Sequence, residues 1–225
     1  MTTMTITNPL DLRIKQVLEE KSLLKHEFYR EWTEGTLPKA KIREYTRQYF
    51  HFETAFPRFL SAIHTRTDSL RIRQLLLANL WDEEYGDRNH ATLWLDFAAA
   101  LGVKEKDVRG AKLNPETRAL IDHFSSEAHE APIGEALATL FAYEGQVPAV
   151  AFEKIRGLHQ HYGLVPDQFQ FFSVHIVSDI AHSNAELEAL SESCMDDDAV
   201  VQATSDACDK LLAFLDGCYA YSGAN

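Results

Sequence analysis

The segment H-I-V-S-D-I-A-H, residues 175–182, carries three polar side chains at helical spacings of four and three: His175, Asp179 and His182. An α-helix turns about 100° per residue, so these side chains project from one strip of a helix about 60° wide. Imidazole and carboxylate groups bind metal ions, so the strip fits a set of metal ligands. The same spacing also fits a polar stripe that faces water.

Two further segments place acidic or imidazole groups on a helical stripe that is otherwise apolar. In residues 76–101 the stripe has leucines and aromatic residues at both ends. Its middle holds three polar residues: Glu83, Asp87 and His90. In residues 133–144 the stripe is Ile133, Leu137, Leu140 and Glu144, and a carboxylate again stands where an apolar side chain is expected.

Buried carboxylates need a partner, because burying an unpaired ionised carboxylate costs at least several kcal/mol. Three helices direct acidic or imidazole groups inward, and the sequence shows no comparable set of inward lysines or arginines. A dinuclear metal centre would supply the missing positive charge, as in carboxylate-bridged helical bundles. Spacing leaves the ligand choice open. Asp82, Glu83, Glu84 and Asp87 lie near one site, and Glu186 competes with Asp179.

The composition limits the class of protein. Of the 225 residues, 45% are apolar and 25% are charged, which is typical of a soluble globular protein. A net charge of -12 argues against nucleic acid as a partner, because phosphates repel an acidic surface. We see no signal peptide and no apolar run long enough to cross a bilayer. The three cysteines, Cys194, Cys208 and Cys218, form no disulfide framework, so we expect a cytoplasmic protein.

Helical periodicity runs through almost the whole sequence and must position these groups. We expect helices over residues 9–32, 38–65 and 68–101, and further helices that begin near Asn114, Pro132, Val165 and Asp196. Pro148 should kink or break the helix that contains it. Alternating strand patterns, repeats and linkers are missing. The sequence therefore predicts one all-α domain over residues 1–225, with seven or eight helices around a shared core.

Several motifs resemble those of a known family. They are HEFYREW (26–32), AFPRFLSAIHTR (55–66), LLLANLWDEEYGDRNH (75–90), YEGQVP (143–148), EKIRGL (153–158) and H-x3-D-x2-H (175–182). In order and spacing the chain resembles the haem-oxygenase-like di-iron oxidases. Within them it is most similar to the chlamydial proteins associating with death domains and their bacterial relatives. The resemblance covers about residues 10–217 and implies a haem-oxygenase-like helical bundle.

The resemblance implies a dinuclear metal site, either Fe/Fe or Fe/Mn. Its ligands by position would be Glu83, His90, Glu144, His175, Asp179 and His182. This choice favours Glu83 over Glu84 and Asp87, and Asp179 over Glu186. Glu83 and His90 are seven residues apart, about 20° out of line on one helix, so both could reach one centre.

The resemblance also implies an unusual activity, the synthesis of para-aminobenzoate for folate from the protein's own side chains. By position, Tyr29 would supply the ring and Lys154 the amino group, with O2 and an external reductant as co-substrates. Tyr45 and Tyr143 would carry a radical or position the reacting ring. A homodimer stays open, and a death-domain partner is implied only by the family's name.

Two other functions compete with this one. A di-metal oxidase could act on a separate small molecule and leave Tyr29 and Lys154 unaltered. A helical interaction module could bind partner proteins through acidic helix faces, but the inward ligand residues would then be unexplained. From the sequence pattern alone, Tyr29 fits a core aromatic residue and Lys154 fits a solvated lysine on a helix.

Overall fold

A computed structural model describes residues 8–193 and 196–223, and for residues 177–181 and 191 it describes the backbone without the side chains. These described parts contain eleven α-helices and two 3-10 helices, and no β-strand. The expected all-α class is therefore confirmed. The helix count is higher than the expected seven or eight because two predicted helices are broken and a short one is added.

The elements follow one another in a simple order along the chain. They are α1 (Pro9–Glu20), η1 (Leu23–Lys25), α2 (Glu27–Glu34), α3 (Lys39–Arg66), α4 (Leu70–Glu84), α5 (His90–Ala100), α6 (Glu105–Arg109), α7 (Pro115–Glu130), α8 (Ile133–Glu144), α9 (Val147–His161), η2 (Pro166–Gln168), α10 (Gln170–Ser193) and α11 (Asp197–Tyr219). Side-chain oxygens of Asn8, Ser69, Asn89, Asn114 and Asp196 accept hydrogen bonds from the first turns of α1, α4, α5, α7 and α11, so these polar residues fix where those helices begin.

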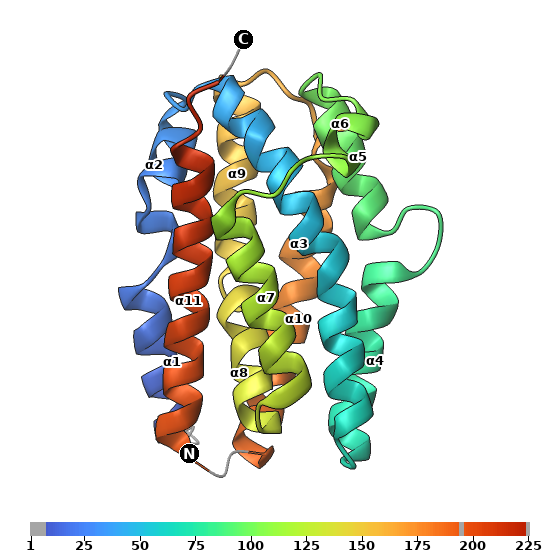
Figure 1. The fold of residues 1–225 in the computed structure, drawn as a ribbon, viewed down its shortest axis with the longest axis vertical. Helices are drawn as coiled ribbons and strands as arrows, with labels where there is room; N and C mark the ends of the chain where they lie inside the picture. The colour runs from blue at the N-terminus through green and yellow to red at the C-terminus, as the bar shows by residue number, and fades with distance from the viewer. Residues whose placement is uncertain (1–7, 194–195, 224–225) are drawn as a thin grey trace, which may run out of the picture.

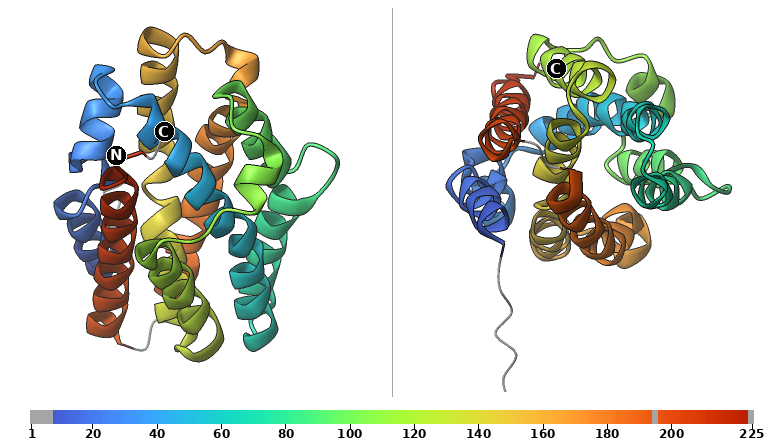
Figure 2. Two further views of the ribbon diagram at one scale, coloured as in Figure 1. Left: turned by 45° about the horizontal axis from the view of Figure 1, so that its top comes forward. Right: turned by 90° about the horizontal axis from the view of Figure 1, so that it is seen from below.

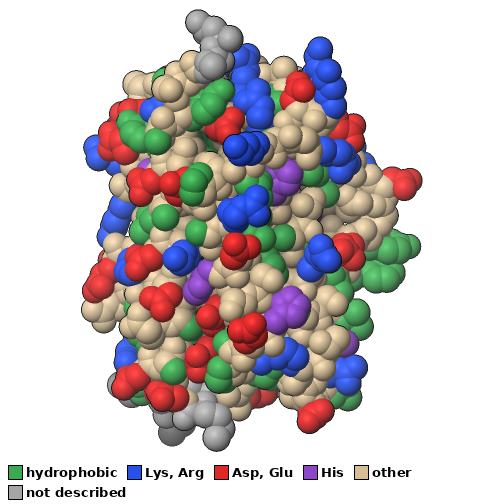
Figure 3. All heavy atoms as spheres, viewed as in Figure 1, with side chains coloured by type: hydrophobic (Ala, Val, Ile, Leu, Met, Phe, Trp, Pro, Cys, Tyr) green, Lys and Arg blue, Asp and Glu red, His purple; other side chains and the backbone are tan. Residues whose placement is uncertain are grey.

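The helices form one bundle around a shared core. Helix α3 runs through the bundle and contacts α4, α5 and α7, while α11 packs on α1, α7 and α8 (Figure 1). Seen end-on, the helices surround one another without a gap that would divide the chain (Figure 2). None of the described helices is both long and apolar enough to span a membrane. On the face shown in Figure 3, acidic and basic side chains are interspersed and no broad basic patch is present.

The first predicted helix, residues 9–32, is wrong as a single element. It breaks between α1 and α2, because Nδ1 of His26 accepts a hydrogen bond from the backbone N–H of Phe28 at 3.0 Å and starts a new helix there. The break gives α2 its own direction, and α2 carries Tyr29.

The predicted helix over residues 68–101 is also wrong as a single element. It ends at Glu84, and α5 begins at His90 after a turn that contains Gly86 at a φ of 83°. Asn89 caps α5 by accepting a hydrogen bond from the backbone N–H of Thr92 at 3.0 Å. Glu83 and His90 therefore lie on two different helices, and the argument from one continuous helix fails.

The break near Pro148 is confirmed. Helix α8 ends at Glu144, and α9 starts at Val147 with Pro148 in its first turn. This position suits proline, because the first turn of a helix has no internal partner for its N–H groups. Helix α10 begins at Gln170, later than expected, because residues 166–168 form η2 instead.

Helices α2 and α9 approach each other closely at Gly157. A Cβ atom at this position would lie 2.7 Å from the backbone oxygen of Trp32, so only glycine fits. The indole N–H of Trp32 donates to the backbone oxygen of Lys154 at 3.2 Å across the same contact. This contact sets the distance between the helix that carries Tyr29 and the helix that carries Lys154.

We expect Gly157→Ala to lower the free energy of unfolding by about 1–3 kcal/mol, because the added methyl group meets backbone and an indole ring that cannot both move away. Gly217→Ala is the matched control, since the nearest atoms to its Cβ are side-chain atoms of Asn114 and Glu116 and none is a backbone atom. Urea denaturation measures both variants. Equal losses for the two would show that the α2–α9 contact is not tight.

Candidate metal centre and aromatic pocket

Four buried residues bring metal-binding atoms together in the bundle: Glu53, Glu83, His90 and His175. One ligand atom from each lies within 4.8 Å of the others. They come from α3, the end of α4, the start of α5 and the first turns of α10. Four helices thus converge on one point, which places two carboxylates and two imidazoles in a protected interior.

The two imidazoles are held in defined orientations. Nδ1–H of His175 donates to the backbone oxygen of Phe171 at 2.7 Å, which leaves Nε2 as the free ligand atom. Nδ1 of His90 lies 2.8 Å from Oε2 of Glu83 and 4.0 Å from Oε1 of Glu53. The two rings stand 4.3 Å apart, centroid to centroid.

Burial dominates the electrostatics of this cluster. It raises the pKa of Glu83 well above its ordinary value, and the nearby Glu144 carboxylate raises that pKa further. Burial and the charge of Glu83 also raise the pKa of Glu53 to about 8. Burial lowers the pKa of both His90 and His175, so the imidazoles stay neutral. The buried surroundings therefore disfavour ionisation of the Glu53 and Glu83 carboxyl groups.

Some of the carboxylate oxygens at this point lack partners. Among the described residues, Oε1 of Glu53 and Oε2 of Glu144 are buried without a hydrogen bond. Oε1 of Glu144 accepts a hydrogen bond from the buried amide of Asn79 at 2.8 Å. Buried polar atoms without a partner usually indicate an ion or ligand that completes the site.

The donor set fits a metal centre. Carboxylate oxygens together with neutral imidazoles suit iron and manganese, and a divalent cation would satisfy the unpartnered oxygens and neutralise the acids. No described lysine or arginine forms a salt bridge with this cluster. The arrangement can therefore hold metal ions without a change in the backbone.

The six residues expected as ligands have four different outcomes. Glu83, His90 and His175 belong to the four-residue cluster. Glu144 stands beside it, as its effect on the pKa of Glu83 indicates. Nε2 of His182 lies 3.0 Å from Oδ2 of Asp82. The side chain of Asp179 lies outside the described residues, as does all of Cys194.

The competing acids have different surroundings. Glu84 and Asp87 are exposed, and Asp82 is half exposed in its pair with His182. Glu186 is buried and borders a hollow that His182 also lines. The preference for Asp179 over Glu186 stays a prediction.

Glu53 is a cluster member that the sequence analysis missed. It follows Tyr45 and Tyr49 by eight and four residues, so it lies on the apolar face of α3. The signal is the one that indicated Glu83 and Glu144, a carboxylate on an apolar stripe. The family resemblance does not include Glu53 among the ligands that it implies.

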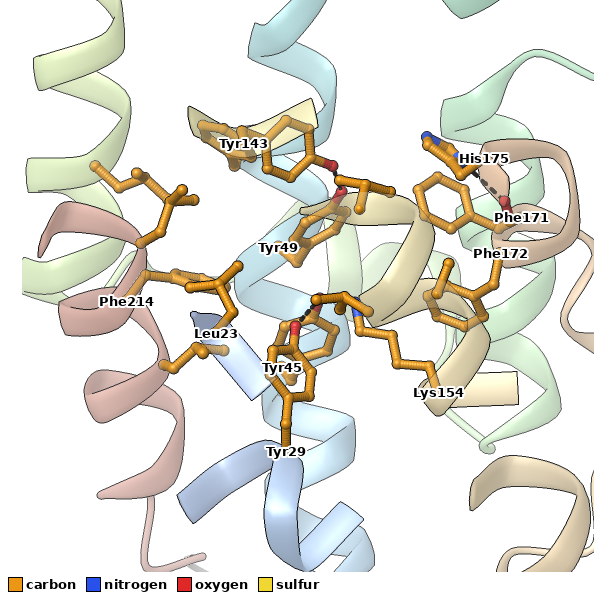
Figure 4. Close-up of a pocket in the computed structure, with 17 residues that line it drawn as sticks. Leu23, Tyr29, Tyr45, Tyr49, Tyr143, Lys154, Phe171, Phe172, His175 and Phe214 are labelled. Carbon is orange, nitrogen blue, oxygen red and sulfur yellow. Dashed lines mark hydrogen bonds between the residues drawn. The ribbon is translucent and has the colours of Figure 1, made fainter. Parts of the chain in front are cut away.

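A second buried group of residues lies next to the cluster (Figure 4). Lys154 Nζ donates to the Tyr45 hydroxyl at 2.7 Å, and the Tyr29 and Tyr45 hydroxyl oxygens lie 3.4 Å apart. Nζ also stands 5.2 Å from the centroid of the Tyr29 ring. Three of the expected catalytic residues therefore meet, and only 6% of the Lys154 surface is exposed.

Tyr49 and Tyr143 connect this group to the metal-binding cluster. Their hydroxyl groups form a hydrogen bond, and the ring of Tyr49 stacks on Tyr45 at a centroid distance of 5.4 Å. A hydrogen bond from Tyr49 also stabilises the carboxylate of Glu53. The tyrosines thus make a continuous chain of contacts from Glu53 to Lys154 and Tyr29.

Lys154 has an unusual environment for a lysine. Burial lowers its pKa to about 7, although the charge of Glu53 acts in the opposite direction. The groups that face it are Tyr29, Tyr45 and Tyr49, whose pKa values burial raises, and His175, whose pKa burial lowers. A large fraction of Lys154 is therefore a neutral amine at pH 7, with a lone pair available for bond formation.

The family model described as iron-containing redox enzyme matches residues 43–215, a span that contains every described member of the metal-binding cluster. The chain belongs to this family of iron-containing redox enzymes. The family assignment agrees with the oxygen and nitrogen ligands found at the cluster and makes iron the metal to expect there.

Curated relatives and solved structures resemble the chain over almost its full length. A protein of Nitrosomonas europaea named 4-aminobenzoate synthase is 40% identical over 97% of this chain and 94% of its own length. A Chlamydia pneumoniae protein of the same name is 37% identical over 93% of this chain and 94% of its own.

Two solved structures share the fold at lower sequence identity. A TenA homologue from Pseudomonas syringae has a TM-score of 0.80 at 19% identity and covers 94% of this chain and 97% of its own. A CADD-like protein of Nostoc punctiforme has a TM-score of 0.70 at 19% identity, covering 93% and 95% of the two chains. The bundle therefore has the haem-oxygenase-like fold.

Metal binding should stabilise the protein strongly, because it neutralises buried acids. With free Mn²⁺ at one hundred times its Kd, the gain is about 2.7 kcal/mol, or roughly 5–10 °C in Tm for a chain of this size. Thermal unfolding with and without Mn²⁺ measures this shift. His175→Ala should abolish it, whereas the exposed His159→Ala should retain it, and an equal shift in both variants would contradict the assignment.

The buried Lys154 should make stability depend on pH. Its folded pKa of about 7 lies below the unfolded value of about 10.4, so the unfolded chain binds more protons between these values. The destabilisation is complete below pH 7 and disappears as the pH rises toward 10. Metal-free wild type should therefore gain stability relative to Lys154→Met from about pH 6 to pH 9. A difference in Tm that does not change with pH would rule out a lowered pKa.

Proposed function

We propose that the protein makes 4-aminobenzoate, the same compound as para-aminobenzoate, from its own side chains in an O2-dependent reaction. Tyr29 supplies the ring and Lys154 supplies the nitrogen. The names of the relatives that are 36–40% identical support this product. The meeting of Tyr29 and Lys154 beside a metal-binding cluster supports the source of its atoms.

The carbon skeleton of the product matches a tyrosine side chain. 4-Aminobenzoate has a ring with a carboxylate and an amino group at opposite positions, and tyrosine has Cβ and a hydroxyl group at those positions. The reaction breaks the Cα–Cβ bond of Tyr29, oxidises Cβ to the carboxylate and exchanges the ring C–O bond for a bond to Nζ of Lys154. It also breaks the Cε–Nζ bond of Lys154.

The electrons of this conversion balance with O2 as oxidant. Oxidation of Cβ to a carboxylate, with hydrogen left on Cα, removes four electrons, which one O2 accepts on reduction to water. Exchange of the hydroxyl for an amino group on the ring is redox-neutral. Conversion of Cε of Lys154 to an aldehyde releases two further electrons. Together with two electrons from the external reductant, they reduce a second O2 to water. Each chain therefore reacts once.

The observation that carries the proposal is the size of the pocket between Tyr29, Tyr45 and Lys154. Its free volume is about 30 Å³, which suits about one water molecule. A benzene-sized ligand needs a cavity of about 150 Å³. The aromatic ring that reaches Lys154 is therefore one of the protein's own, which favours this proposal over an oxidase of a separate aromatic substrate.

The surrounding side chains position the reacting groups. The Tyr45 hydroxyl accepts a hydrogen bond from Nζ of Lys154 and contacts the Tyr29 hydroxyl, so it holds the amine near the ring position that must receive it. Apolar and aromatic residues line the rest of the pocket, including Phe171, Phe172 and Phe214, and exclude bulk water. Burial lowers the pKa of the amine to about 7, so about half of it is neutral and able to form a bond at pH 7.

The metal centre completes the proposal. Glu53, Glu83, His90, Glu144 and His175, with Asp179 and His182 by resemblance, would hold two metal ions, Fe/Fe or Fe/Mn. When bound, such a centre supplies the activation of O2, with electrons from an external reductant. Cys208 and Cys218 are free thiols, which agrees with the reducing cytoplasm that we propose as the compartment.

Isotope labelling tests the origin of the product. Protein that carries ring-¹³C tyrosine and ε-¹⁵N lysine, reacted with Fe²⁺, Mn²⁺, a reductant and O2 in unlabelled buffer, should release 4-aminobenzoate with both labels. The peptides that contain Tyr29 and Lys154 should lose the corresponding mass. Tyr29→Phe and Lys154→Arg should lower the yield at least about tenfold, which corresponds to about 1.4 kcal/mol.

Tyr162→Phe is the matched control, because Tyr162 is a buried tyrosine whose hydroxyl donates to the backbone oxygen of Leu37, away from the reacting amine. It should retain the wild-type yield. An unlabelled product, or normal yield from Lys154→Arg with nitrogen taken from ammonium, would rule out the proposal and favour a conventional oxidase.

A further inference from the structure

A hollow of about 380 Å³ opens on the surface between α3 and the connection from α4 to α5, which projects at the right of Figure 1. Two members of the metal-binding cluster, Glu53 and Glu83, line it from within. The exposed Glu84 lines it at the surface. The hollow therefore links solvent with the carboxylate side of the cluster.

Glu53 lines this hollow and, within the described part of the chain, has a carboxylate oxygen without a hydrogen-bond partner. Its side chain is 3% exposed, and its Oε1 has no hydrogen-bond partner among the described residues. An ion that enters the hollow would meet this oxygen and the carboxylate of Glu83 before it reaches either imidazole of the cluster.

Pro57 also lines the hollow and removes a hydrogen bond from its wall. In an unbroken helix the N–H of residue 57 would bond to the carbonyl oxygen of Glu53, but proline has no N–H. Helix α3 therefore lacks one backbone hydrogen bond at Glu53, the residue that reaches the cluster.

The charge of the hollow suits a cation. Three carboxyl groups line it, the buried Glu53 and Glu83 and the exposed Glu84, so Glu84 places an acidic group at the surface end. The other lining residues are uncharged: Thr54, Pro57, Asn89 and Ala91. Clefts lined by one sign of charge raise the local concentration of the opposite ion and its rate of association. Carboxylate oxygens are also ligands for Fe²⁺ and Mn²⁺.

A second hollow, of about 330 Å³, reaches the predicted ligands from another side of α4. It is mostly apolar, and its surface carboxylate, Asp82, is already hydrogen-bonded to His182. It offers an entering ion fewer unengaged carboxylates than the first hollow. This second hollow is the natural comparison in an experiment.

We propose that the hollow lined by Glu53, Glu83 and Glu84 is the route by which divalent metal ions reach the centre. Glu84 acts as the outer, transient ligand and passes the ion to Glu53 and Glu83. The inference rests on the metal centre of the proposed function, but it does not depend on the fate of Tyr29 or Lys154.

The rate of Mn²⁺ uptake by metal-free protein tests this route. Loss of the electron paramagnetic resonance signal of free Mn²⁺ reports binding after rapid mixing. Glu84→Gln should slow uptake by about tenfold at low salt. Electrostatic attraction into a charged cleft raises association rates by a factor of about ten or more, and the variant removes the exposed charge. The difference should shrink in 1 M salt, while the final amount of bound Mn²⁺ stays at the wild-type value.

Ala91→Leu, which narrows the hollow without a change of charge, should slow uptake at both salt concentrations. Two controls match these variants: Glu105→Gln removes an exposed carboxylate elsewhere, and Ala78→Leu narrows the second hollow. Neither control should change the rate.

Wild-type uptake rates in Glu84→Gln and Ala91→Leu, or slower uptake in Ala78→Leu, would overturn the proposed route. In these cases the final Mn²⁺ content stays normal, so the proposed function survives. Wild-type protein that binds no metal at all would instead remove the metal centre, and the route with it.

Discussion

Buried carboxylates that form no salt bridge with a described lysine or arginine are the constraint on which the rest of the structure depends. Glu53, Glu83 and Glu144 come from three helices and meet in the interior, where an uncompensated charge costs several kcal/mol. The neutral imidazoles of His90 and His175 share the space but cannot balance three charges. Divalent metal ions would resolve this conflict, and bound metal would then stabilise the bundle as well as supply chemistry.

The aromatic pocket depends on the same centre. Lys154 lies in a cage of aromatic rings, where burial favours its neutral form. The stacked rings of Tyr45 and Tyr49 lead back to Glu53, which accepts a hydrogen bond from Tyr49. Tyr49 therefore lies between the metal-binding cluster and the residues that the proposed reaction consumes. The small pocket allows little else to compete with them.

Much of this architecture could be predicted from the sequence, because helical periodicity is a local property. It indicated an all-α bundle, and it indicated inward acids at Glu83 and Glu144. The breaks after Glu20 and Glu84 were missed because the apolar period continues across them, although the cap at Asn89 and the glycine at Gly86 were visible signals. Residue spacing along one helix could not predict how Glu83 and His90 meet, because a turn separates the two helices that carry them.

The contacts that define the site are not local. Tyr29 and Lys154 are more than one hundred residues apart, and nothing in the periodicity of either helix indicates that they meet. Only the family resemblance pointed to them. Glu53 was accessible in principle, since it stands on the same face as Tyr49, but its role depends on helices that pack against α3 only in the folded chain.

Diffraction from crystals of the reconstituted protein, recorded at the iron and manganese absorption edges, tests the central claim most directly. The account predicts two anomalous peaks, both within coordination distance of the carboxylates and imidazoles that converge from α3, α4, α5, α8 and α10. Ordered side chains in these positions with no anomalous peak would contradict it, because the buried acids would then be stabilised by shared protons rather than by metal ions.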